Sequence, residues 1–172
     1  KILLNLAIRA GELDYEGRNR LLAEMSDEVA ELVLRNNYLQ AQAISMMERF
    51  SGSRLGSKQH FINVLEEEGL LDRQLESLPH DEELDERRDR GEGLFRPELA
   101  VLLSYSKIVL YQQLLDSDVP EDGYLSNELA RYFPARLQER MGPFMQQHRL
   151  KREIVATQVT NSLVNRMGAS FV

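Results

Sequence analysis

LFRPELAVLLSYSKIVLY, residues 94–111, decides the fold of this chain, because it has the pattern of a helix that is apolar on nearly every side. Pro97 suits the first turn of a helix, where the amide that proline lacks would have no helical partner. The pattern continues to about Asp116. A helix apolar all round usually lies at the centre of a bundle, so Leu103 and Ile108 are expected in the core. The alternative is that this helix is a docking surface for another chain.

The composition is that of a globular protein with a core of its own. Hydrophobic residues make up 42% of the 172 residues and charged residues 28%, both close to typical values. The formal net charge of -7 argues against broad nucleic-acid binding, which depends on neutralising phosphates. There is no Cys, and His60, His80 and His148 form no metal-binding pair, so no metal site is expected.

The apolar runs are shorter than the roughly 20 residues that a membrane helix needs. The first residues, KILLNLAIR, lack the cleavage site of a signal peptide. A cytoplasmic protein without a membrane partner is therefore expected. The sequence also begins at Lys1 in the middle of an apolar pattern, without an initiator Met, which suggests a piece of a longer protein.

The rest of the sequence also predicts helices, separated by turns at glycines and prolines. They are expected over residues 15–25, 27–50, 54–69, 81–90, 97–116, 124–133, 135–141 and 146–167. Ser26 is expected to cap the second of them, and Asn36-Asn37 to interrupt it. Residues 1–9 fit either a helix or a buried strand. The prediction is an all-α fold, an irregular bundle of about eight to ten helices.

Two charged segments are candidate binding sites. Residues 81–92, DEELDERRDRGE, hold seven acids and three Arg, and a solvated helix is more plausible than a cation site because the arginines compete for the carboxylates. The basic start of the last helix, with His148, Arg149 and Arg152, could bind an anion or an acidic surface. The simpler interpretation is a partner inside the same chain, such as residues 81–92.

Neither a Gly-rich phosphate loop nor a Ser–His–acid arrangement nor a carboxylate pair is visible. The residues alone therefore predict a helical domain and do not reveal a reaction.

Four segments together resemble one known family. They are LLAEMSDEVAELVLRNNYLQ (21–40), LFRPELAVLLSYSKIVLY (94–111), RYFP (131–134) and HRLKREIVATQVTNSLVNRMGASFV (148–172). They resemble the C-terminal part of the large bacterial NAD-dependent glutamate dehydrogenases, and they follow one another in the same order. The resemblance implies oxidation of L-glutamate to 2-oxoglutarate and ammonia, with NAD as the hydride acceptor. It also implies that the catalytic residues and the nucleotide-binding fold lie upstream of Lys1, so no catalytic, cofactor or metal residue is assigned here.

The resemblance further implies a single helical domain with three parts. Residues 1–50 would end the dehydrogenase core, residues 51–93 would form a variable helical connection, and residues 94–172 would be the C-terminal helical part. The expected role is core closure, assembly or regulation, with the upstream catalytic domain and further copies of the enzyme as partners. Arg149, Arg152 and Asn161 are the predicted interface residues. The alternative is a free-standing helical interaction module unconnected with an enzyme.

Overall fold

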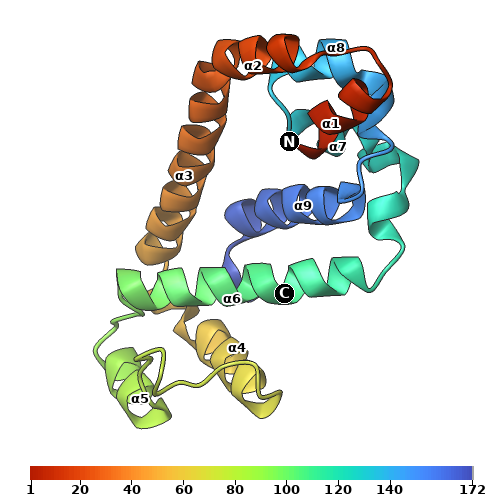
Figure 1. Ribbon diagram of the computed structural model, residues 1–172. Helices are drawn as coiled ribbons and strands as arrows, with labels where there is room; N and C mark the ends of the chain where they lie inside the picture. The colour runs from red at the N-terminus through yellow and green to blue at the C-terminus, as the bar shows by residue number, and fades with distance from the viewer. Residues whose placement is uncertain (172) are drawn as a thin grey trace. The chain divides into compact units, whose positions relative to one another are not determined.

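The computed structural model describes residues 1–171, and its regular elements are helices joined by turns and loops (Figure 1). Within this range there are nine α-helices, four short 3-10 helices and no β-strand, which confirms the prediction of an all-α fold. The α-helices are α1 Ile2–Arg9, α2 Tyr15–Glu24, α3 Ser26–Arg49, α4 Leu55–Glu67, α5 Asp81–Asp89, α6 Arg96–Leu115, α7 Ser126–Arg131, α8 Ala135–Met145 and α9 Lys151–Met167. The 3-10 helices are η1 Gly52–Arg54, η2 Val119–Glu121, η3 Gly123–Leu125 and η4 Ala169–Phe171.

The helices form two compact units, and each unit combines segments that are distant in sequence. Unit 1 consists of Lys1–Tyr38 and Tyr111–Val159. Unit 2 consists of Leu39–Leu110 and the described residues from Thr160 onward. The boundaries fall inside helices α3, α6 and α9, so each of these three helices contributes to both units. The predicted division near residues 51 and 94 stays a prediction.

The core of unit 1 joins α1 and α2 to α7, α8 and the first half of α9. Its buried members are Leu3, Leu4, Ala7, Leu21, Met25, Leu129, Phe133, Leu137, Met141, Phe144, Met145, Ile154 and Val155. At its edge, Arg136 of α8 forms ion pairs with Glu24 at 3.2 Å and Glu28 at 2.7 Å. Residues from both ends of the unit's sequence are therefore needed to complete one core.

The core of unit 2 is built around α6. Leu99 and Leu102 pack with α4, α5 and the segments between them in a cluster that also contains Leu55, Phe61, Ile62, Leu65, Leu71, Leu78, Leu84, Leu94 and Ala169. Leu103 belongs to a second, smaller cluster with Ala43 and Val164. The hydroxyl of Ser106 donates to the carbonyl of Ala169. The prediction that α6 is central to a core is confirmed for this side of the helix.

The prediction that Ile108 lies in the core is wrong, because this side chain, on the other side of α6, is 60% exposed. Sequence periodicity could not reveal this, since apolar residues surround the α6 axis and the neighbouring helices cover only part of it.

Three helix ends also differ from the predictions. The hydroxyl of Ser26 donates to the carbonyl of Leu22 instead of accepting from the next turn, and α3 then runs through Asn36 without interruption. Helix α8 continues past Gly142 to Met145 with Pro143 in its last turn, although a proline there removes a helical donor and crowds the preceding turn. Helix α9 begins at Lys151, five residues later than expected.

One pair of variants tests which side of α6 lies in the core. Leu103→Ala removes a side chain that is 1% exposed, and the cavity should lower the free energy of unfolding by about 2–5 kcal/mol. Ile108→Ala should change it by less than about 0.5 kcal/mol. Urea unfolding followed by circular dichroism measures both, and equal losses in the two variants would contradict this assignment of the core.

Candidate functional site

The basic residues at the start of α9 form hydrogen bonds and ion pairs within unit 1. The guanidinium of Arg152 donates to the carbonyl of Leu115 at 2.7 Å and to the carbonyl of Ser117, and it forms an ion pair with Glu121 at 3.5 Å. Lys151 approaches the same carboxylate at 3.8 Å. The last carbonyls of a helix have no partner within the helix, so Arg152 supplies donors that the end of α6 lacks.

His148 belongs to the core rather than to a basic patch. Its ring is buried and packs edge-on against Phe133, with 5.7 Å between the ring centres. Its Nδ1 accepts from the amide of Leu150 at 3.2 Å. Burial lowers the pKa of His148, chiefly by disfavouring the charged ring, and the positive charge of Arg149 adds to this. The imidazole is therefore neutral at pH 7 and adds no positive charge for an acidic partner.

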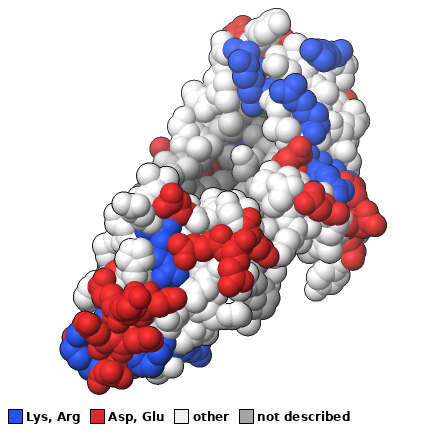
Figure 2. Space-filling model, turned by 90° about the horizontal axis from the view of Figure 1, so that it is seen from below, with Lys and Arg blue, Asp and Glu red and all other residues white. Residues whose placement is uncertain are grey.

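The acidic residues 81–92 are the suggested partners of this basic segment. The two segments belong to different units, so their pairing stays a prediction. Within unit 2, the carboxylates of α5 and the following loop pair with arginines near them in sequence, Arg73, Arg87, Arg88 and Arg90. In Figure 2, the most densely charged region of the face shown has red and blue atoms interleaved. Short-range ion pairs are therefore formed by five of the seven carboxylates, those of Asp81, Glu83, Asp85, Glu86 and Glu92.

The predicted interface residues Arg149, Arg152 and Asn161 do not form one patch. Arg149 precedes α9 and is exposed, Arg152 holds the end of α6, and Asn161 lies half-buried on α9. Nine residues separate Arg152 from Asn161, which places them on opposite sides of a helix with about 3.6 residues per turn. Their role in an interface stays a prediction. Arg152 also binds the carbonyl at the end of α6.

Helix α9 also contains buried polar atoms that the sequence did not reveal. Among the described residues, Thr160 Oγ1, Asn165 Oδ1 and Glu153 Oε2 are buried without a hydrogen-bond partner. Thr160 as a whole is buried, whereas Met167 at the end of the same helix is exposed. Such atoms cost stability unless a partner or water reaches them.

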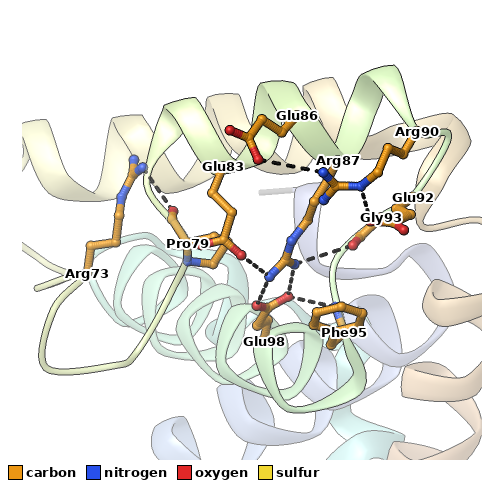
Figure 3. A network of polar contacts seen from close by, with 10 residues as sticks. All are labelled: Arg73, Pro79, Glu83, Glu86, Arg87, Arg90, Glu92, Gly93, Phe95 and Glu98. Atoms are coloured by element: carbon orange, nitrogen blue, oxygen red, sulfur yellow. Dashed lines mark hydrogen bonds and ion pairs between the residues drawn. The ribbon is translucent and has the colours of Figure 1, made fainter.

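The most extensive polar network lies in unit 2 and centres on Arg87 of α5 (Figure 3). Its guanidinium binds both oxygens of Glu98 at 2.8 and 3.0 Å, and Glu83 at 2.5 Å. It lies over the ring of Phe95, 4.2 Å from the centre, and donates to the carbonyl of Gly93 at 3.4 Å. Its side chain is 6% exposed. The expectation of a purely solvated helix at 81–92 is therefore wrong for this side chain.

The surroundings of Arg87 explain its charge state. The hydrogen bond that Arg87 donates to Glu98 is the largest of the causes that raise its pKa, ahead of the bond donated to Glu83, while burial opposes them. Glu98 also accepts from the backbone amide of Phe95 at 2.6 Å, as a carboxylate in the first turn does in a capping box. One carboxylate thus neutralises a buried cation and closes the start of α6.

A second buried arginine, Arg73, holds the segment between α4 and α5. It pairs with Glu66 at 2.7 Å and Asp81 at 3.1 Å, and it donates to the carbonyl of Pro79 at 3.1 Å and to the side-chain oxygen of Asn63 at 2.6 Å. The pKa of Asp81 is lowered, first by the hydrogen bond from Gln59 and then by Arg73. The role of this network is structural, because one buried guanidinium joins α4, the carbonyl of Pro79 and the first residue of α5.

Lys58 of α4 is buried without a carboxylate partner. Its ammonium donates to the carbonyls of Ser51 and Arg54 at 3.3 and 3.4 Å. Burial, together with the charge of Arg54, lowers its pKa to about 8. A buried lysine with a lowered pKa is sometimes a catalytic base, but no second reactive group accompanies this one.

The remaining candidates are weak. A hollow of about 360 Å³ in unit 1 is lined by the turn between α1 and α2 and by Arg20, Glu24 and Arg140, and its mixed charges favour no ligand class. No group of side chains suited to a metal ion occurs among residues 1–171. Over the same range, none of the helices has the length and apolarity needed to cross a membrane.

The Arg87 network generates a test of stability. Arg87→Ala leaves Glu98, whose side chain is only 11% exposed, without its cation. The free energy of unfolding should fall by about 3–5 kcal/mol, as when one partner of a buried pair is removed. The matched control is Arg88→Ala one residue away, where an exposed pair should contribute less than about 1 kcal/mol. Equal losses in urea unfolding would contradict the proposed importance of the buried pair.

Lys58 generates a test of pH dependence. Its pKa is about 8 in the folded chain and 10.5 without burial, so between these values the unfolded chain binds a proton that the folded chain has released. The free energy of unfolding should therefore rise with pH across this window, by about 2–3 kcal/mol. Lys107, whose pKa burial also lowers, acts in the same direction.

Lys58→Met should remove most of this rise and stabilise the protein at neutral pH. Lys151→Met, at a partly exposed site, serves as the control and should keep the rise. Urea midpoints at several pH values from about 7.5 to 10 measure the effect, and an unchanged slope in Lys58→Met would refute it.

Two known families match different segments of the chain. Residues 1–47 match the family described as Bacterial NAD-glutamate dehydrogenase, catalytic domain, and residues 91–172 match Glutamate dehydrogenase, C-terminal. The whole chain is 52% identical to an NAD-specific glutamate dehydrogenase of Pseudomonas aeruginosa and 50% identical to one of Halomonas elongata. Over 171 residues, 99% of the chain, it is 36% identical to the NAD-specific glutamate dehydrogenase of Mycobacterium tuberculosis.

The chain spans 11% of the length of the first two relatives and 10% of the third. Its matches join the end of a catalytic domain to a C-terminal region, in the order that the resemblance of residues 21–40, 94–111 and 148–172 implied. The chain therefore belongs to the family of large bacterial NAD-specific glutamate dehydrogenases.

Proposed function

We propose that this chain is a non-catalytic part of an NAD-specific glutamate dehydrogenase and that it closes the end of the catalytic domain. The parent enzyme would oxidise L-glutamate to 2-oxoglutarate and ammonia and reduce NAD in the cytoplasm, with the reacting groups and the NAD site upstream of Lys1. The sequence of this segment has no dinucleotide-binding loop, which supports placing the chemistry elsewhere.

One observation supports the closing role most directly. In unit 1, α1 and α2 lie within the match to the catalytic domain, whereas α7, α8 and α9 lie within the match to the C-terminal region. Leu3, Leu4 and Leu21 from the first group share one core with Leu129 and Leu137 from the second. The apolar faces of α1 and α2 therefore gain their cover from the C-terminal region, and burial of this kind supplies most of the stability of a fold.

The ion pairs of Arg136 fasten the same two regions at their polar edge. Arg136 belongs to the C-terminal match, and its partners Glu24 and Glu28 belong to the catalytic-domain match. These side chains are partly exposed, so their contribution is small and serves orientation more than stability. Assembly into a homo-oligomer, with Arg149 and Asn161 at an interface, is a further part of the proposal.

The test uses the full-length enzyme. Leu129→Ala combined with Leu137→Ala removes two buried side chains from the C-terminal half of the shared core. Each should cost about 2–5 kcal/mol, so glutamate-dependent reduction of NAD should be lost at a lower temperature than in the wild type. Tyr124→Ala, at a side chain that is 90% exposed, is the control and should leave the inactivation temperature unchanged.

An unchanged inactivation temperature in the double variant would contradict the closing role. Glutamate turnover by the purified 172-residue chain would contradict the placement of the chemistry upstream.

A further inference from the structure

Helix α3 carries two apolar stripes on nearly opposite sides. The first contains Met25, Val29, Leu32 and Ala43, and its ends, Met25 and Ala43, are buried. The second consists of Ala30, Val33, Leu34 and Tyr38, spaced i, i+3, i+4 and i+8, which places them on one side of a helix. We refer to these four residues as the outer stripe.

The outer stripe is uncovered among the described residues. Leu34 and Tyr38 are each 67% exposed and Val33 is 53% exposed. Helix α3 is one continuous helix through this region (Figure 1), so the exposure is not caused by a break or a turn. Single exposed apolar residues are common, but four at helical spacing form a surface suited to a second packing layer.

A polar side completes the pattern. Glu28, Glu31 and Arg35 lie together between the two stripes, on one flank of the helix. A helix on the surface needs one apolar side, whereas α3 has two apolar sides and a charged flank. This is the pattern of a helix that is packed between two layers and meets solvent along one edge.

We propose that the outer stripe is covered by the preceding part of the catalytic domain, from the same polypeptide. The inference rests on the proposed function, because it takes this chain to be part of the longer enzyme. Residues 1–47, which include the whole outer stripe, match the catalytic-domain family. The relatives that match contain far more chain than these 172 residues, which make up 11% of their length.

The size of the stripe favours cover from the same polypeptide over a second copy of the chain. The nine residues of helix from Ala30 to Tyr38 span only about 12 Å. A stable contact between two proteins buries about 800 Å² on each partner, which four side chains on so short a segment do not provide. Packing within one chain needs no such area, because it carries no cost of lost translational freedom.

The experiment measures whether Leu34 is covered in the full-length enzyme. Leu34→Cys and the control Arg35→Cys are each introduced, and their labelling by a maleimide is followed in the native enzyme, with the labelling of the unchanged enzyme subtracted. The 172 residues contain no other Cys. Glutamate turnover before labelling shows that each variant is folded. If Leu34→Cys is inactive, Tyr38→Cys on the same stripe replaces it.

The proposal predicts that Leu34→Cys is labelled about tenfold or more slowly than Arg35→Cys, because only local unfolding exposes a covered site. The protection should not change when the enzyme is diluted. Equal labelling rates would overturn the proposal, and protection that disappears on dilution would do so as well, because the cover would then be a second copy. If labelling is equal while Leu129→Ala/Leu137→Ala still lowers the inactivation temperature, the closing role stands and only the cover of α3 fails.

Discussion

The buried charge of Arg87 is the constraint on which the rest of unit 2 depends. A guanidinium with so little contact with water needs a carboxylate beside it, and Glu98 provides both of its oxygens. This pair fixes α5 against the first turn of α6. It also places Gly93, whose backbone passes so close to Ser51 that a Cβ at this position would collide with it. The hydroxyl of Ser51 then donates to the carbonyl of Leu94, which joins the end of α3 to the same point.

Arginine has the same task at three places in this acidic chain. Arg73, Arg87 and Arg152 each combine carboxylates with a backbone carbonyl that no helix satisfies. The planar guanidinium suits this, because its several donors point in fixed directions. The chain has 21 basic against 28 acidic residues, and these three cations bind its own backbone. The basic start of α9 is an example, since Arg152 faces inward and His148 is neutral.

The sequence alone predicts where most of the helices begin and end, but it does not predict which side chains meet between helices. The helices expected at 54–69 and 146–167 end near Gly69 and Gly168, which both have positive φ, and the apolar period located α6 to within a residue at each end. Those features are local. The burial of Arg87 depends on Glu98, eleven residues away in another helix, and the exposure of Ile108 depends on which neighbours reach α6. For the same reason Arg152 could be proposed as an interface residue, because its carbonyl partners lie more than thirty residues earlier.

The discontinuous units have a consequence for the growing polypeptide on the ribosome. The first segment of unit 1 ends at Tyr38, but its other segment begins only at Tyr111. At ordinary rates of synthesis this interval lasts about 4–15 s, during which the apolar sides of α1 and α2 have emerged without their cover. Unit 2 also stays incomplete until late in synthesis, because its last segment starts at Thr160. Chaperones that bind exposed apolar helices therefore have a longer opportunity here than in a domain whose neighbours in space are neighbours in sequence.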